Sequence, residues 1–221
     1  MLFQLLQALS SLDTVQRITV YALPVIFAIT VHEAAHGYVA RHFGDMTAHA
    51  AGRISFNPLR HIDPVGTILV PLITMMVGGI LFGWAKPVPV NFSRLRHPKR
   101  DMLWVSAAGP GSNLLMACMW AIVIKLAPVF PTFAALPLAL MGTAGIMINT
   151  ILMMLNLFPL PPLDGGRIAV SLLPHPWAWR FAKIEPYGFI ILLILMFTHI
   201  LGAILWPLIM AFLQLISWIF F

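Results

Sequence analysis

Long hydrophobic runs separated by short polar stretches dominate the chain. Three clear runs cover residues 18–40, 102–127 and 138–158, and a further apolar stretch covers residues 187–221. About 20 apolar residues in a helix cross the hydrocarbon core of a bilayer. The pattern therefore predicts an all-α polytopic membrane protein, built as a bundle of about four to six transmembrane helices.

Composition and length indicate one membrane-embedded unit. Of the 221 residues, 60% are hydrophobic and 9% are charged, and the mean hydropathy is +0.92. We therefore expect a single integral-membrane domain over residues 1–221, with its core in residues 18–167. Residues 187–221 exceed one span, and Gly202 and Pro207 interrupt them, which predicts a helical hairpin or a kinked helix.

The stretch over residues 64–83 is apolar but contains several helix breakers: Pro64, Gly66, Pro71, Gly78 and Gly79. We predict that it forms a re-entrant or interfacial element that does not cross the membrane. Residues 53–56 and 83–91 are predicted to be short β-like loop segments, because Pro87 and Pro89 exclude a helix from the second. The free edge of that second segment is a candidate for β-pairing with an unwound substrate.

A charged pentad, His32-Glu33-Ala34-Ala35-His36, lies inside the first hydrophobic run. Ionisable groups within a span are costly, so they need a partner or a chemical role. On a helix, His32 and His36 are one turn apart and can bind the same metal ion. Glu33 is then close enough to act on water at that ion. The spacing predicts a metal site with Glu33 as its catalytic base.

A tetrahedral zinc with two histidine ligands needs one more protein ligand and a water. Asp164 is the predicted third ligand, since no other acid directly follows a hydrophobic run among Pro and Gly residues. His42 has metzincin spacing, but Val39 replaces the glycine that lets such a chain turn, so His42 is excluded. Asn113 and Asn156 are candidate catalytic residues that donate to an oxyanion, with interhelical hydrogen bonding as the alternative for both.

These motifs resemble the site-2 protease family of intramembrane zinc metalloproteases, in its compact form without PDZ or CBS domains. The likeness rests on HEAAH, GRISFNPLRHIDPVGT, GWAKPVPVN, AGPGSN and NLFPLPPLDGG. It implies one Zn²⁺ per chain, held by His32, His36 and Asp164. Glu33 would be the general base, and Asn156 would assist in the site. The implied substrate is a transmembrane-helix protein, cut in or near the membrane by regulated intramembrane proteolysis.

Residues 64–83 are an insertion relative to the best-known family members, so the topology of those members cannot be copied directly. The number of membrane crossings and the distribution of charge predict the topology instead. His36 and Asp164 meet at one metal only if that insertion returns to the face it left. Eleven of the 13 Lys and Arg residues, all except Arg17 and Lys125, then share one face. The positive-inside rule assigns this face to the cytoplasm. We therefore expect an inner-membrane protein whose active site opens to the cytoplasmic side.

Other classes of protein fit part of the pattern. A metal-ion or small-solute transporter could use the same buried His/Asp site, although no inverted repeat is visible and Glu33 would lack a role. An inactive scaffold descended from a protease and a zinc hydrolase acting on lipid are further alternatives. Basic residues here report orientation, so we expect the lipid bilayer as a partner and no nucleic acid. The sequence predicts no oligomeric state.

Overall fold

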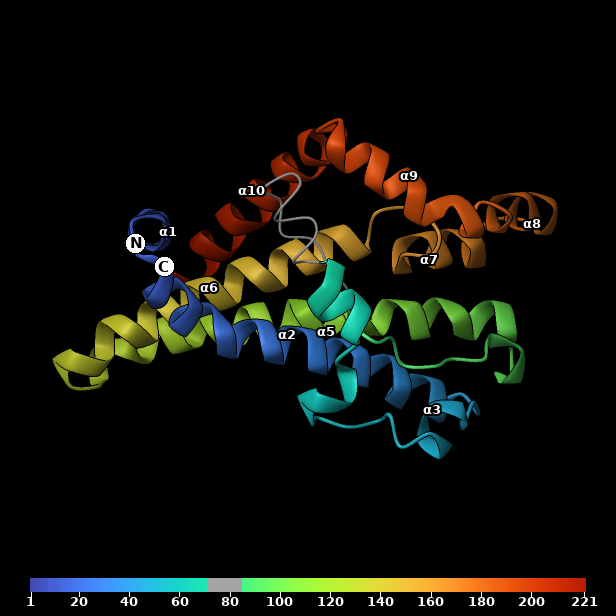
Figure 1. Cartoon of the computed structure of the whole chain (residues 1–221), viewed down its shortest axis with the longest axis horizontal. Helices are drawn as coiled ribbons and strands as arrows, with labels where there is room; N and C mark the ends of the chain where they lie inside the picture. The colour runs from blue at the N-terminus through green and yellow to red at the C-terminus, as the bar shows by residue number, and fades with distance from the viewer. Residues whose placement is uncertain (71–84) are drawn as a thin grey trace.

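A computed structural model describes residues 1–70 and 85–221, which form an α-helical protein (Figure 1). The described α-helices are α1 (Leu2–Ser10), α2 (Thr14–His42), α3 (Thr47–Ala50), α5 (Pro98–Leu126), α6 (Thr132–Asn156), α7 (Asp164–Leu172), α8 (His175–Ala182), α9 (Glu185–Phe197) and α10 (Ile200–Phe220). Short 3-10 or π-helical turns are η1 (Pro58–His61), η2 (Pro64–Leu69), η3 (Phe92–Arg94) and η4 (Ala127–Val129). No β-strand occurs in these ranges.

Four described helices, α2, α5, α6 and α10, are long and apolar enough to cross a membrane. The prediction of an all-α polytopic membrane protein is therefore confirmed. Helices α2, α5 and α6 run side by side, with α5 antiparallel to the other two, and α10 packs on α6 (Figure 1). With 29 residues, α2 is about 43 Å long and exceeds a hydrocarbon core of about 30 Å.

The first two spanning helices begin about four residues before their hydrophobic runs, because polar caps extend them. The Asp13 side chain accepts from Gln16 N (2.9 Å), and the Gln16 side chain accepts from Asp13 N (3.1 Å), which starts α2 with a capping box. At α5, Pro98 occupies the first turn and the Asp101 carboxylate accepts from His97 N (2.8 Å). Hydrophobicity alone does not predict these charged first turns.

The third spanning helix also differs from the hydrophobic run over residues 138–158. Helix α6 begins at Thr132 and includes Pro137, where a proline removes only one backbone hydrogen bond. Residues 187–221 contain two helices, α9 and α10, that meet at an angle (Figure 1). Thr198 and His199 join them, and His199 adopts a left-handed conformation with φ of +60°.

Close packing of small and large side chains joins these helices. Buried leucines and isoleucines recur along one face of α10 and pack in a core shared with α5 and α6: Leu201, Leu205, Ile209, Leu213 and Ile216. A Cβ on Gly145 of α6 would lie 2.4 Å from the Trp120 ring of α5. A small residue is therefore required there, and the two backbones approach closely, as is typical of membrane helix pairs.

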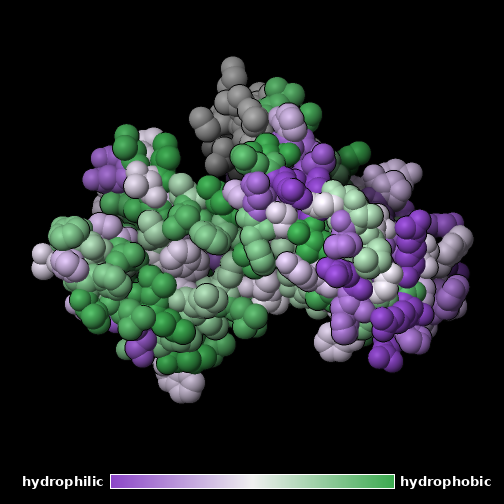
Figure 2. Space-filling model, turned by 90° about the horizontal axis from the view of Figure 1, so that it is seen from below, coloured by the Kyte–Doolittle hydropathy of each residue, from purple (hydrophilic) through white to green (hydrophobic). Residues whose placement is uncertain are grey.

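The polar connection between α2 and α5 leaves and re-enters the bundle at the same end. Phe43 O, just after α2, accepts a hydrogen bond from Arg96 N, just before α5 (2.9 Å). Figure 2 shows hydrophilic residues gathered at the end that holds α3 and α8 in Figure 1, with hydrophobic residues over much of the rest. Most of the predicted re-entrant stretch over residues 64–83 lies outside the described residues.

Of the two loop segments predicted to be β-like, residues 53–56 and the described residues 85–91 are irregular rather than stranded, and residues 83 and 84 lie outside the described residues. The hydrogen bonds of the described segments are made with turns and helix residues and not with a neighbouring strand: Lys86 N donates to His61 O (2.9 Å), and Val88 N donates to Glu33 Oε2 of α2 (2.7 Å). The Arg53 guanidinium donates to Lys86 O (2.8 Å). Prolines 87 and 89 have no N–H, so this segment cannot form a continuous ladder. The segment instead lies against the C-terminal half of α2.

Candidate metal centre

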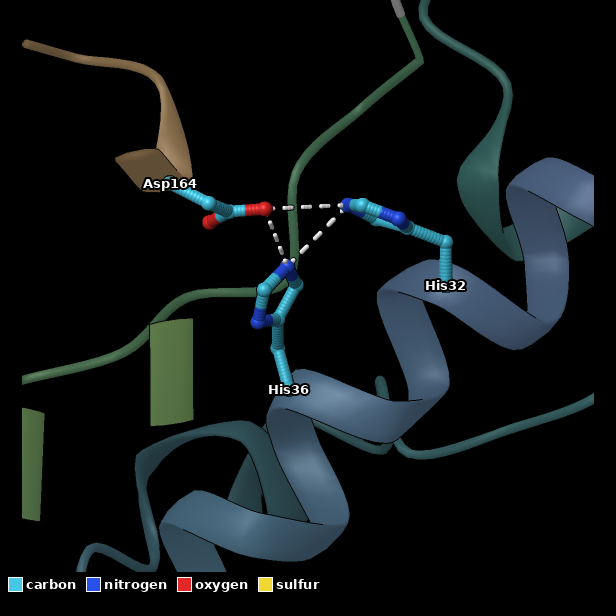
Figure 3. Close-up of side chains that lie close together, drawn as sticks. All are labelled: His32, His36 and Asp164. Atoms are coloured by element: carbon cyan, nitrogen blue, oxygen red, sulfur yellow. Dashed lines mark hydrogen bonds and ion pairs between the residues drawn. The ribbon is translucent and has the colours of Figure 1, made fainter. Parts of the chain in front are cut away.

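His32 and His36 project from the same face of α2, as the helical period requires (Figure 3). Their Nε2 atoms lie 3.1 Å apart, and the two rings are nearly perpendicular at 80°. Both side chains are buried, although α2 is otherwise a hydrophobic spanning helix. The pentad therefore presents two imidazole nitrogens to one point inside the bundle.

Asp164 reaches the same point from the first turn of α7. Helix α6 ends at Asn156, and a proline-rich loop leads directly to Asp164. Gly165 and Gly166 pack against that loop: a Cβ on Gly165 would lie 2.1 Å from Leu157 O, and one on Gly166 would lie 2.2 Å from Pro161 N. The Asp-Gly-Gly sequence thus lets α7 begin against the loop and point Asp164 towards α2 (Figure 3).

Hydrogen bonds on the far side of each imidazole fix which nitrogen faces the centre. His32 Nδ1 donates to Asn113 Oδ1 (2.6 Å), and His36 Nδ1 donates to the Val105 carbonyl oxygen (2.7 Å). Because each of these oxygens is an acceptor, the proton of each neutral ring lies on Nδ1. Both Nε2 atoms therefore direct lone pairs towards Asp164, as metal-binding histidines do.

The geometry of the trio fits a zinc ion. Asp164 Oδ2 lies 3.3 Å from each Nε2, and this buried oxygen has no hydrogen-bond donor among the residues that the structure describes. Tetrahedral zinc with bonds of about 2.0–2.2 Å holds ligand atoms about 3.3–3.6 Å apart. One cation between three acceptors at this spacing satisfies all of them at once. Within residues 1–70 and 85–221, no other three His, Cys, Asp or Glu side chains lie close enough together to share a metal ion.

Gly109 of α5 covers the centre from a third helix. A Cβ at this position would lie 2.4 Å from His36 Nε2 and 2.5 Å from His32 Nε2. These distances are close to those of a coordination bond, so any larger residue would occupy space that a metal and its water require. The absence of a side chain at residue 109 is therefore part of the site.

Glu33, the predicted base, is anchored by the segment that precedes α5. Its Oε2 accepts a hydrogen bond from Val88 N (2.7 Å), and within residues 1–70 and 85–221 Oε1 has no such partner, so it can contact water. Asp45 holds the same segment further along, since its Oδ2 accepts from Asn91 N (2.7 Å). Burial raises the pKa of Asp45, but hydrogen bonds from Thr47 and Asn91 outweigh it and lower that pKa. The segment is thus fixed by two carboxylates.

This anchor predicts the effect of removing the Val88 N–H. In Val88→Pro, we expect turnover of a cleavable substrate to fall about tenfold to a hundredfold, since a hydrogen bond to a charged group contributes about 1.5–3 kcal/mol. Zinc content should be unchanged, because no ligand is touched. The measurement is a cleavage rate in detergent together with zinc per chain.

Val90→Pro is the matched control, because Val90 N makes no hydrogen bond within the described residues. We expect this variant to retain near wild-type turnover. Equal loss in both variants would contradict the anchor and favour β-pairing of substrate along the segment. The structure already limits such pairing, since Lys86 N and Val88 N are occupied and the two prolines cannot donate.

The two predicted amides lie at different distances from the centre. Asn113 contacts His32, and its two Nδ2 hydrogens point to Asn149 Oδ1 (2.8 Å) and Ala28 O (3.3 Å). These contacts fit a positioning role better than donation to an oxyanion, which remains a prediction. Asn156 Nδ2 donates to Leu152 O of its own helix (3.0 Å), and its predicted catalytic role is likewise untested.

Two residues at the centre were not predicted from the sequence. Asn149 is fully buried behind Asn113, and Gly109 lies against the imidazoles. A signal for Asn149 exists, because an amide within a hydrophobic span needs a partner. A glycine in a membrane helix is too common to single out Gly109, since many such glycines only permit helix contact.

Fold and site together define a class: a helical membrane metalloprotein with an HExxH helix and a distant aspartate at one buried point. The chain is 40% identical over 193 residues to "Putative zinc metalloprotease YwhC" of Bacillus subtilis, which covers 86% of this chain and 85% of that protein. It is 28% identical over 201 residues to "Putative zinc metalloprotease Rip2" of Mycolicibacterium smegmatis, covering 88% and 70% of the two chains.

A similar relative is "Putative zinc metalloprotease Rip2" of Mycobacterium tuberculosis, 29% identical over 183 residues, with 80% of this chain and 66% of that protein covered. The chain belongs to the site-2 protease-like family of zinc metalloproteases. No protein-family model matches it, and no solved structure matches it. The predicted zinc cofactor and the integral-membrane class are thereby confirmed.

Proposed function

We propose that this metalloprotease is a site-2-type intramembrane endopeptidase that hydrolyses a peptide bond in or near the transmembrane helix of a membrane-protein substrate. The observation that carries the proposal is the location of the trio. Two ligands come from within a membrane-spanning helix, and all three side chains are buried in the bundle. A protease built this way acts where a transmembrane substrate can approach laterally.

Each residue of the centre has a defined part in this reaction. His32, His36 and Asp164 would hold the zinc, whose bound form supplies a Lewis acid that activates water and polarises the scissile carbonyl. Glu33 accepts the proton of the attacking water and later delivers it to the leaving amine. The Val88 N–H orients the Glu33 carboxylate through Oε2, and Oε1 is the oxygen that performs this transfer.

The proposed location is the inner membrane, with the active site opening to the cytoplasm. Supporting this orientation, most basic residues belong to the last turn of α2, to η3 and the start of α5, and to α7 and α8, which gather towards one end of the bundle (Figure 1): Arg41, Arg94, Arg96, Lys99, Arg100, Arg167, Arg180 and Lys183. Cytoplasmic loops of membrane proteins carry such an excess. Labelling of Lys99→Cys by a membrane-impermeant reagent, in a Cys118→Ser background, tests which side this end faces.

The direct test uses the purified protein in lipid vesicles with single-span substrates of different sequence. We expect cleavage in or near the apolar segment, mapped by mass spectrometry of both products. Removal of zinc by a chelator should stop cleavage, and added zinc should restore it. The matched control substrate carries the same apolar segment with leucines inserted around the mapped peptide bond. Leucine favours the helix, so this peptide bond should stay helical and inaccessible to the protease.

Zinc-dependent cleavage only in soluble loops, far from the bilayer, would overturn the intramembrane assignment while leaving a metalloprotease. Zinc flux across the vesicle membrane without any cleavage would favour the transporter alternative. Hydrolysis of the vesicle lipid, measured as released fatty acid, would favour a lipid hydrolase. Each of these outcomes uses the same preparation.

A further inference from the structure

A second buried amide lies behind the metal centre, on the side away from the ligands. Asn113 of α5 and Asn149 of α6 are both 0% exposed. Asn113 Nδ2 donates to Asn149 Oδ1 (2.8 Å), and Asn149 Nδ2 donates to Gly145 O of its own helix (2.8 Å). The two amides thus continue inward from the His32–Asn113 contact.

The hydrogen bonds of this chain have one direction. The Gly145 carbonyl can only accept, so Asn149 must turn its NH₂ group towards Gly145 and its oxygen towards Asn113. Asn113 must then turn its NH₂ group towards Asn149, with a longer second contact to Ala28 O (3.3 Å), and its oxygen towards His32. Only His32 with its proton on Nδ1 completes the series, and that tautomer leaves Nε2 free for a metal.

Helix packing brings the second amide within reach. Gly142 and Gly145 face α5, and a Cβ on either would collide with Ile124 or with the Trp120 ring, at 2.6 and 2.4 Å. The close approach of α6 to α5 therefore depends on the turn that precedes Asn149. The same turn provides the carbonyl that orients the Asn149 amide.

We propose that Asn149 is a positioning residue of the zinc site, which acts through Asn113 to hold His32 in its metal-binding tautomer and ring orientation. The proposal rests on the zinc centre and not on the substrate class. Outer-shell partners of a ligating histidine contribute about 10–100-fold to metal affinity. A bond that only joined two membrane helices would contribute to stability but would leave zinc affinity unchanged.

The test measures zinc affinity by competition with a chelator in detergent, for metal-free protein whose thermal unfolding is followed in parallel. We expect Asn149→Leu to bind zinc about tenfold to a hundredfold more weakly. Asn149→Asp should bind within about threefold of wild type, because a protonated carboxyl can accept from Asn113 and donate to Gly145 O. This rescue separates positioning from loss of side-chain volume.

Thr150→Val is the matched control. Thr150 is the next residue of α6, is also fully buried, and its Oγ1 donates only to Ile146 O of its own helix (2.7 Å). We expect its zinc affinity to equal that of wild type even if its unfolding temperature falls. Should Asn149→Leu not fold, Asn149→Ala replaces it in the same comparison.

A double-mutant comparison tests whether the effect passes through Asn113. In an Asn113→Leu background, Asn149→Leu should cause no further loss of zinc affinity, because the connection is already broken. The proposal would be overturned if Asn149→Leu bound zinc within about threefold of wild type. It would also be overturned if Asn149→Leu lowered zinc affinity equally in the wild-type and Asn113→Leu backgrounds. Failure of wild-type protein to cleave substrates would contradict the proposed function but not this assignment, since zinc affinity is the readout.

Discussion

Gly109→Ala is expected to abolish stoichiometric zinc binding and, with it, proteolysis. The added methyl group would lie 2.4–2.5 Å from both imidazole Nε2 atoms. Contact with a carbon atom is favourable at about 3.5–4.0 Å, so the imidazoles or α5 must move by about an ångström. Movement of the imidazoles separates them from Asp164, and movement of α5 removes the Asn113 and Val105 oxygens that hold the two rings. Zinc per chain after purification and a cleavage assay measure the effect.

Gly111→Ala is the matched control for this substitution. Gly111 lies on the same helix, and a Cβ there meets nothing within 4 Å. Both variants gain about 1 kcal/mol of helix propensity from the same chemical change, so only the location of the methyl group differs. We expect Gly111→Ala to retain zinc and activity. Full zinc in Gly109→Ala would show that α5 does not lie against the metal ligands.

The ligand trio could be predicted because each signal is local in sequence. The spacing of His32 and His36 follows from the helical period, and burial within an apolar run makes a metal the simplest partner for both. Asp164 stands out because few acids are present and it directly follows a span. The structure then brings these residues within 3.3 Å of one another.

The support around the trio could not be predicted, since it depends on how helices distant in sequence align. The Glu33–Val88 bond joins residues 55 positions apart, and the Asn113–Asn149 bond joins residues 36 apart. A hydrophobic run predicts that a helix spans the membrane but does not predict its rotation, because lipid and protein neighbours are both apolar. Asn113 was accordingly predicted either to donate to an oxyanion or to form an interhelical hydrogen bond, and its contact with His32 was not predicted.

Helix boundaries show the same limit on a smaller scale. Hydropathy predicts the part of a helix inside the bilayer, while the ends of α2 and α5 extend into polar turns stabilised by Asp13 and Asp101. Those capping residues are visible in the sequence, as Asp-x-x-Gln before one span and Pro-x-x-Asp before the other. Reading caps together with hydropathy would have predicted both starts more closely.

Glu33 is the proposed general base. In Glu33→Gln, we expect proteolysis to fall by about 10²–10⁴-fold, the usual contribution of a general base. The amide has the shape of the carboxylate, and its oxygen can still accept from Val88 N, so the anchored segment should stay in place. What the amide cannot do is accept a proton from water. Zinc per chain should equal that of wild type, since His32, His36 and Asp164 are unchanged.

Glu185→Gln is the matched control, because Glu185 is the other glutamate of the chain and lies in the first turn of α9, outside the ligand trio. It loses only a half-exposed ion pair with Arg167 at 3.3 Å, a kind of contact that contributes about 0–1 kcal/mol. We expect wild-type cleavage from this variant.

Retained proteolysis in Glu33→Gln would remove Glu33 as the base, whereas loss of zinc would mean that Glu33 helps to hold the metal. Zinc transport preserved in Glu33→Gln would instead favour a transporter, in which this carboxylate has no chemical step to perform.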